Sequence, residues 1–188
     1  QILAAETMVV VEDLYRPYRP KRRTRAMIAK EKGLEPLAAL ITLQKAEKPI
    51  EVYAEEYVNP EKEVKSVKEA IDGAKDIIAE SVSDEADYRS WIRKATVQHG
   101  KVISQAKDEK AESVYEMYYD FEEPVTKLAG HRVLALNRGE KEKFLTVKIE
   151  APQDDILRYL EKKMIHSDNP HTTPILKEVA EDSYKRLI

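Results

Sequence analysis

Basic side chains are concentrated in one short stretch of the chain, between Tyr15 and Gly33. The residues that we single out there as candidates for binding an anionic partner are Arg16, Arg19, Lys21, Arg22, Arg23 and Arg25. The whole chain has a formal net charge of -3, so this positive charge is local. Guanidinium and ammonium groups bind phosphates and release counterions from nucleic acid, and nothing in the stretch is arranged to read base edges. We therefore expect an unspecific electrostatic contact with nucleic acid, and the alternative is an ordinary solvated or ion-paired surface.

No other group of residues suggests a catalytic or cofactor site. His166, Asp168 and His171 are close enough in sequence to resemble metal ligands, but they lie in a proline-bounded turn that suits Asp and Asn without a metal. The 5 glycines stand singly, which excludes a phosphate-binding loop and a dinucleotide-binding fingerprint. The chain contains no cysteine, which excludes disulfides, thiolate metal sites and a cysteine nucleophile. We expect no catalytic residue, no metal and no cofactor, so the chain is not predicted to be an enzyme.

Three further features allow both a functional and a structural interpretation. Tyr118 and Tyr119 could stack on nucleic-acid bases, but tyrosines at helical spacing are more often half-buried in a core. Pro17 and Pro20 form a P-x-x-P pattern that could bind an SH3-type domain, and we interpret it as an elbow between two helices. The acidic residues 51–63 could cover the basic stretch, and some of its arginines could pair with Glu51, Glu55 or Glu56. A solvated helix face and linker is the simpler interpretation of that segment.

The composition is typical of a soluble globular protein. Hydrophobic residues make up 42% and charged residues 36% of the 188 positions, and helix formers are frequent. No uncharged run is long enough to span a bilayer. Together with the lack of cysteine, this predicts a cytoplasmic protein with no membrane partner.

Apolar residues at helical spacing predict helices along most of the chain. A helix over residues 2–15 should stop before the prolines, and Thr24 can cap a second helix over residues 25–32 that Gly33 ends. Pro36 opens a third helix with Leu37, Leu40, Ile41 and Leu43 as its buried stripe. Tight turns between these helices predict a cluster of helix-turn-helix type.

The second part of the chain continues the helical pattern. Ser66 is predicted to cap a long helix, and Ser83 to cap the next one, which Gly100 ends. Further helices are expected at residues 111–121, at 131–138 with Gly139 as the stop, at 152–165 and at 175–184.

Two segments, residues 101–107 and 144–150, alternate polar and apolar side chains as strands do. Two strands are too few for a free-standing sheet, so we expect them to pair as a ribbon packed on helices. The predicted fold is mainly α and multi-helical, with a small two-stranded β ribbon and a helix-turn-helix-like N-terminal cluster. We divide it into an N-terminal helical cluster with the basic elbow, residues 1–63, and a central helical region with the ribbon, residues 64–188.

Several segments carry a family resemblance in the same order along the chain. The run Glu12-Asp13-Leu14-Tyr15 continues through the basic stretch and is followed by Glu31-Lys32-Gly33-Leu34-Glu35-Pro36. The other segments are residues 69–80, 115–124, 131–140 and 182–187. Together they resemble the N-terminal region of the Tex family of bacterial transcription accessory proteins over nearly the whole chain.

The resemblance implies a fragment of a longer protein that acts in transcription. In that family, an RNase H-like domain, helix-hairpin-helix elements and an OB-fold RNA-binding domain follow this region. The expected partner is therefore nucleic acid, RNA or DNA, bound mainly through those domains, with the transcription machinery as a second expected partner and no small-molecule substrate. The alternative is a scaffold for protein–protein interaction that makes no nucleic-acid contact of its own. The resemblance supplies no active site.

Overall fold

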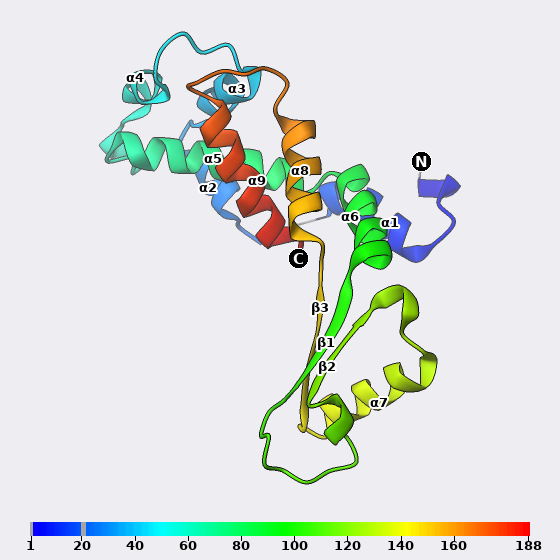
Figure 1. Cartoon of the computed structure of the whole chain (residues 1–188). Helices are drawn as coiled ribbons and strands as arrows, with labels where there is room; N and C mark the ends of the chain where they lie inside the picture. The colour runs from blue at the N-terminus through cyan, green and yellow to red at the C-terminus, as the bar shows by residue number, and fades with distance from the viewer. Residues whose placement is uncertain (1, 20–21) are drawn as a thin grey trace. The chain divides into compact units, whose positions relative to one another are not determined.

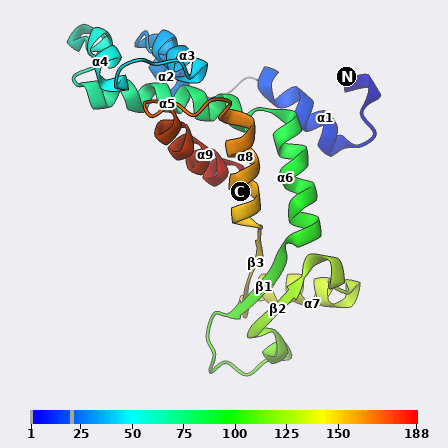
Figure 2. The ribbon, with the colours of Figure 1, turned by 45° about the horizontal axis from the view of Figure 1, so that its top comes forward.

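The structure is a computed structural model that describes residues 2–19 and 22–188. The chain forms two compact units, which we describe separately (Figures 1 and 2). The first unit contains the described residues up to Ser90 together with Asp154–Ile188, and the second is Trp91–Gln153. Helices predominate and one small antiparallel sheet is present, so the mainly α fold class is confirmed. None of the helices in the described ranges is long and apolar enough to cross a membrane.

The first unit begins with short helical elements. A 3-10 turn, η1 (Ile2–Ala4), precedes α1 (Met8–Tyr15). The helix predicted over residues 2–15 is therefore interrupted, because Thr7 is an N-cap whose hydroxyl accepts the Val10 N–H at 3.4 Å. A second 3-10 turn, η2 (Arg16–Tyr18), follows α1 directly, and the backbone becomes extended at Arg19.

The predicted cap and stop of the second helix are confirmed. Helix α2 (Arg25–Glu31) begins after Thr24, whose hydroxyl accepts the Met27 N–H at 3.2 Å. Gly33 follows it with a φ of 77°, the left-handed conformation that glycine adopts without strain. Helix α3 (Glu35–Leu43) comes next with a proline in its first turn. Its Leu37 and Ile41 are buried as predicted, whereas Leu43 is 67% exposed and does not belong to the buried stripe.

The central helix of the first unit is α5 (Val67–Ser83), which is 17 residues long. Between α3 and α5 the chain forms α4 (Ile50–Ala54) and the 3-10 turns η3 (Glu55–Tyr57) and η4 (Pro60–Lys62). Helices α2, α3 and α4 all pack on α5. Residues on both sides of position 63 thus share one compact unit.

A serine lies at each end of helix α5, and the two side chains form different hydrogen bonds. Ser66 caps its start as predicted, with its hydroxyl accepting the Glu69 N–H at 3.2 Å. The prediction that Ser83 caps the next helix is wrong, because α5 continues through Ser83 and the buried hydroxyl donates to the Ala79 carbonyl at 2.7 Å. Helix α6 (Ala86–His99) starts only after Asp84, and Gly100 follows it.

Two C-terminal helices complete the first unit. Helices α8 (Gln153–Met164) and α9 (Thr173–Leu187) agree closely with the predicted ranges, and α9 packs on α5. The turn between them is joined to the end of α3 by Gln44, whose side chain is buried. Its amide donates to the Met164 carbonyl at 2.7 Å, and its oxygen accepts the His166 N–H at 2.8 Å and the Ser167 N–H at 3.1 Å.

The second unit combines a three-stranded antiparallel sheet with helix α7 (Gly130–Lys141) and the part of α6 from Trp91 onward. Strands β1 (Lys101–Ala106) and β3 (Leu145–Glu150) pair as predicted, and a third strand, β2 (Asp120–Pro124), joins the other edge of β1. The order is β2-β1-β3, with Ser104 opposite both Phe121 and Val147. The helix predicted over residues 111–121 is wrong, since this segment holds only the 3-10 turn η5 (Glu116–Tyr118) and the start of β2.

Helix α7 (Gly130–Lys141) follows the 3-10 turn η6 (Val125–Lys127) and contributes to the core of this unit. Gly139 does not stop the helix as predicted, but lies buried within it. The core consists of Val102, Tyr115, Tyr118, Leu136 and Leu145. Tyr118 is therefore a core residue, and the Tyr119 ring packs against the same core, which supports the structural interpretation of this pair.

Candidate nucleic-acid interface

Four of the six basic residues selected from the sequence line one hollow in the first unit. We call this hollow, which has a volume of about 570 Å³, the arginine hollow. The residues that line it are Arg16, Arg19, Arg22, Arg23, Thr24, Glu80, Ser83, Asp84 and Arg186. Five arginines thus face two carboxylates, and the hollow carries a net positive charge. Lys21, also selected from the sequence, and Pro20 lie outside the described residues.

The local conformation of the elbow brings its arginines together. Pro17 lies in the first turn of η2 and fixes its own φ. Residues three apart lie on the same side of a 3-10 turn, so Arg16 and Arg19 face the same way. The backbone is extended at Arg19, and Arg22 and Arg23 lie just before the Thr24 cap of α2. Arg25, in the first turn of α2, does not line the hollow.

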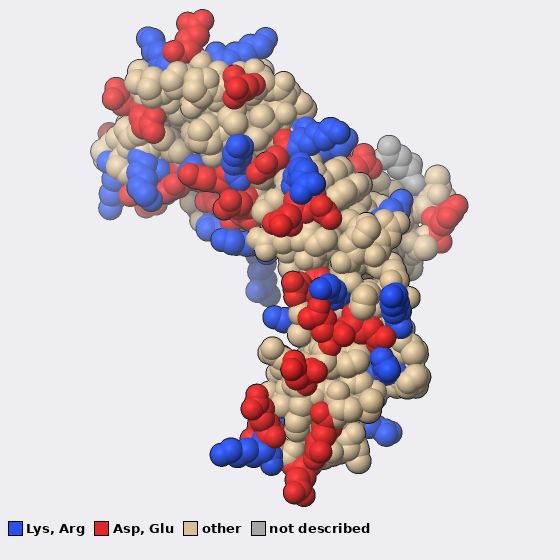
Figure 3. All heavy atoms as spheres, in the orientation of Figure 1, with Lys and Arg blue, Asp and Glu red and all other residues tan. Residues whose placement is uncertain are grey.

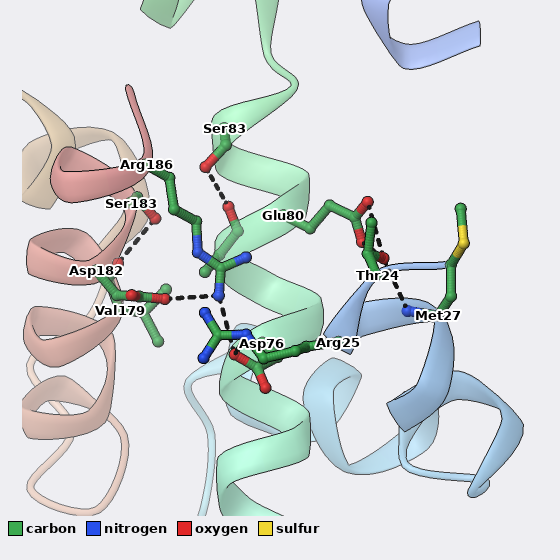
Figure 4. Close-up of polar contacts among 11 residues, drawn as sticks. Thr24, Arg25, Met27, Asp76, Glu80, Ser83, Val179, Asp182, Ser183 and Arg186 are labelled. Atoms are coloured by element: carbon green, nitrogen blue, oxygen red, sulfur yellow. Dashed lines mark hydrogen bonds and ion pairs between the residues drawn. The ribbon is translucent and has the colours of Figure 1, made fainter. Parts of the chain in front are cut away.

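A row of carboxylates on α5 holds the surrounding segments in place. Asp76, Glu80 and Asp84 follow one another at intervals of four residues, so they share one side of the helix. Figure 4 shows the side chains of Asp76 and Glu80 between the start of α2 and the end of α9. Glu80 accepts the Thr24 hydroxyl at 3.1 Å, and Asp84 Oδ1 lies 3.9 Å from Arg16 Nε.

Asp76 connects two arginines from opposite ends of the chain. Its Oδ1 accepts a hydrogen bond from Arg186 at 2.9 Å and lies 3.8 Å from Arg25 Nε (Figure 4). Arg186 also pairs with Asp182, one turn earlier on α9, at 2.8 Å. Since the Asp76 side chain is only 21% exposed, these contacts are partly shielded from water and tie α2 and α9 to α5.

The arginines of the hollow differ in how far their charge is already neutralised. Arg16 lies near Asp84. Arg23 pairs with Glu31 at 2.5 Å, and the side chains of Arg23 and Glu31 are both more than half exposed. Arg19 and Arg22 are exposed, and no carboxylate among residues 2–19 and 22–188 lies within ion-pair distance of either. These two guanidinium groups are therefore the most accessible to an added anion.

The pairing partners of the basic stretch are not those suggested by the sequence. Glu51, Glu55 and Glu56 form no ion pair with its arginines within the described part of the chain; Asp84, Glu31 and Asp76 take that place. Exposed ion pairs contribute only about 0–1 kcal/mol, so Arg16 and Arg23 can exchange a carboxylate for a phosphate at small cost. Over the face shown in Figure 3, basic side chains lie among acidic ones.

Sequence analysis missed Arg186 as a member of the site. It lies in the last turn of α9, far along the chain from the basic elbow, and only the packing of α9 on α5 brings it to the hollow. No local pattern around Arg186 marks this position. Its side chain is 24% exposed, so it is less accessible than the arginines of the elbow.

The histidines considered as metal ligands belong to a turn whose backbone N–H groups donate to side-chain oxygens. The His166 N–H donates to Gln44, and the His171 N–H donates to the Asn169 side chain at 2.9 Å. In the ranges that the structure describes, no group of three or more His, Asp or Glu residues is arranged to hold a metal ion.

The tyrosines whose pKa values are shifted take part in structural contacts outside the arginine hollow. Burial raises the pKa of Tyr88 and of Tyr159, whose rings meet edge to face with their centroids 5.9 Å apart. Burial and a hydrogen bond to Glu142 raise the pKa of Tyr115. These shifts accompany tyrosine packing and do not indicate acid–base catalysis.

Comparison with known proteins gives a consistent set of matches. Residues 44–180 match a family model described as Tex central region-like. The chain is 52% identical over 181 residues to uncharacterized protein YdcI of Bacillus subtilis, covering 95% of this chain and 25% of that protein. It is 36% identical over 160 residues to the Transcriptional accessory protein Tex of Neisseria gonorrhoeae, covering 82% of this chain and 20% of that protein. It is 28% identical over 203 residues to human S1 RNA-binding domain-containing protein 1, covering 100% of this chain and 20% of that protein. The chain thus spans between a fifth and a quarter of the length of these relatives.

Proposed function

This chain belongs to the Tex family, and from that premise we propose that it is a helical scaffold of a transcription accessory protein that also contacts nucleic acid through the arginine hollow. The observation that carries the proposal is the exposure of Arg19 and Arg22 on a hollow lined by five arginines. Guanidinium groups bind phosphate oxygens in a forked geometry and keep their charge at any physiological pH.

The contact is unspecific and adds to binding by other parts of the longer protein. Nothing around the hollow is arranged to enter a groove and read base edges, so affinity depends on salt more than on sequence. The name of the human relative includes an S1 RNA-binding domain, which supports nucleic acid as the partner class of the longer protein. The main RNA-binding domains lie outside this chain in the proposal.

The test is a double substitution, Arg19→Ala with Arg22→Ala, measured by oligonucleotide binding at two salt concentrations. Each phosphate contact to duplex contributes about 0.9 to the slope of log affinity against log salt, so the variant should lose up to about 1.8 of that slope. Arg158→Ala is the matched control, because Arg158 is 77% exposed on α8 and does not line the hollow. If the double variant keeps the wild-type affinity and slope, the hollow does not contact nucleic acid.

A second function, docking of the transcription machinery without nucleic-acid contact, is favoured by the surface of α1. Met8, Val9 and Val10 are 73%, 45% and 37% exposed, and such neighbouring apolar side chains often mark a protein contact. Binding of purified RNA polymerase to the wild type and to Met8→Lys distinguishes the two functions. Loss of polymerase binding in Met8→Lys, with no effect of the arginine substitutions on oligonucleotides, would support the docking function.

We further propose that this region has no catalytic activity and acts in the cytoplasm. The family resemblance brings no active site, and the polar turn with Asp168 and His171 is held by the Asn169 side chain, which accepts the His171 N–H. Hydrolase or nuclease turnover that disappears on substitution of Asp168 or His171 would contradict the first statement. Cell fractionation of the longer protein would test the second.

A further inference from the structure

The elbow contains a three-residue repeat, Tyr-Arg-Pro-Tyr-Arg-Pro, over residues 15–20. Its first part is helical: Tyr15 has φ and ψ of -78° and -28°, and Arg16 has -51° and -42°. Side chains three residues apart are eclipsed in a 3-10 turn, so the tyrosines and the arginines fall into two separate rows. Arg16 and Arg19 line the hollow, whereas Tyr15 and Tyr18 do not.

The tyrosine row is unusually open to solvent. Tyr18 is 79% exposed and Tyr15 is 47% exposed. A tyrosine ring normally covers a large part of its area against other side chains, because that burial is its main contribution to stability. Here Tyr18 directly precedes the exposed Arg19 in the chain, and its ring leaves most of its surface available to a ligand.

We propose that Tyr18, Arg19 and Arg22 bind single-stranded nucleic acid, with a base stacked on Tyr18 and the adjoining phosphates held by the two arginines. The inference rests on the proposed function and adds that the nucleic acid bound is single-stranded. Proteins that bind single strands combine a basic track for the backbone with aromatic rings on which bases stack. Tyr18 and Arg19 are consecutive, with Cα atoms about 3.8 Å apart, so the long arginine side chain reaches the backbone of a nucleotide stacked on the ring.

The same arrangement disfavours a duplex. In a duplex the bases stack on each other, so no base face is available to Tyr18 unless the helix is opened. Glu80 and Asp84 also line the hollow on the side of α5, and their negative charge repels a phosphate that approaches there. A rigid duplex therefore gains the phosphate contacts at Arg19 and Arg22 alone, while a flexible single strand gains these contacts and the stacked base.

The inference is tested with two substitutions at one exposed position, Tyr18→Ala and Tyr18→Phe. The protein is titrated against a single-stranded RNA, a single-stranded DNA and a blunt duplex of the same sequence, and binding is followed by fluorescence anisotropy. Tyr18→Ala should weaken binding of the tighter single strand by about fivefold or more, the lower end expected for one stacked base. Tyr18→Phe retains the ring face and should bind within about twofold of the wild type. Circular dichroism confirms that both variants fold.

The outcomes separate this inference from the proposed function. If the Arg19 and Arg22 double substitution leaves every oligonucleotide affinity unchanged, the proposed function fails and the inference fails with it. If that variant loses affinity for all three oligonucleotides while Tyr18→Ala binds as the wild type does, the proposed function stands and the stacking inference is overturned. A wild-type preference for the duplex over both single strands also overturns it. The tighter of the two single strands identifies RNA or DNA as the ligand.

Discussion

The carboxylates beside the elbow limit how strongly its arginines attract an anion. Asp84 lies 3.9 Å from Arg16, and both side chains face solvent in part. An Asp84→Asn substitution keeps the size and shape of the side chain but removes its charge and replaces one acceptor oxygen with an amide donor. We expect oligonucleotide affinity to rise by up to about fivefold at low salt, the value of one exposed ion pair. The salt slope should steepen by up to about 0.9, because Arg16 becomes available for one more phosphate.

A control for this prediction exists on α8. Asp155 lies 3.8 Å from Arg158, and neither residue lines the hollow. Asp155→Asn changes the net charge by the same amount as Asp84→Asn. An equal gain in affinity from both substitutions would show that net charge matters and that the position of Asp84 does not.

Gly139 lies where an added methyl group should lower the stability of the second unit. A Cβ at this position would lie 2.5 Å from Leu145 Cδ1 and 3.2 Å from Tyr115 Cδ1, both side chains of the core. Gly139→Ala gains about 1 kcal/mol of helix propensity but overpacks the core at a cost of about 1–3 kcal/mol. We expect a net loss of about 1 kcal/mol in the free energy of unfolding, measured by urea denaturation.

Gly130, in the same helix, is the matched control. A Cβ at Gly130 meets no atom within 4 Å, so Gly130→Ala should leave stability unchanged or raise it slightly. Similar stabilities for the two alanine variants would show that the contact with Leu145 relaxes without cost.

Local sequence patterns identified part of the site and missed the rest. The arginines of the elbow are neighbours in sequence, so their positive charge is visible without a structure. The carboxylates of α5 and Arg186 reach the hollow only because α2 and α9 pack on α5. Neutralisation by Asp84 and Asp76 follows from that packing, so the possible pairing with Glu51, Glu55 or Glu56 is not found among the described residues.

The turn between α8 and α9 depends on one buried amide side chain. Gln44 accepts the His166 and Ser167 N–H groups and donates to the Met164 carbonyl, so its removal leaves three backbone groups without these partners. Gln44→Ala should lower the free energy of unfolding by about 2–4 kcal/mol, since each unsatisfied buried group costs about 1–3 kcal/mol and the turn can partly open to water.

The comparison for this prediction is Gln98→Ala. Gln98 is exposed on α6, and such surface substitutions change stability by about 0.5 kcal/mol or less. Thermal or urea denaturation of both variants measures the difference. A Gln44→Ala variant as stable as Gln98→Ala would show that water replaces the amide fully.

Two features that sequence analysis assigned wrongly, strand β2 and the role of Ser83, have separate physical causes. Strand β2, Asp-Phe-Glu-Glu-Pro, is an edge strand whose charges and proline discourage further pairing, and these same residues hide its strand character. Ser83 can cap a helix or bond back to the carbonyl four residues earlier, and the burial of its side chain selects the second bond. Long helices with regular apolar spacing, such as α8 and α9, were predicted closely because their signal is local.

The discontinuous composition of the first unit could not be inferred from the sequence. The first unit is built from two separate segments, with residues 91–153 inserted between them. Apolar periodicity shows which side of a helix is buried but not which helix it packs against. The contact between α5 and α9 therefore could not be inferred, although both helices were.

Each unit has buried leucines of its own, which predicts that a core mutation acts mainly within its unit. Leu136 lies in the core of the second unit and Leu176, on α9, in that of the first; each is 2% exposed. Substitution of either by alanine should cost about 2–5 kcal/mol of local stability. Hydrogen exchange followed by mass spectrometry should show Leu136→Ala lowering protection in β1, β3 and α7, and Leu176→Ala lowering it in α5 and α9. If both variants lose protection equally throughout the chain, the two units unfold as one cooperative body and the prediction is wrong.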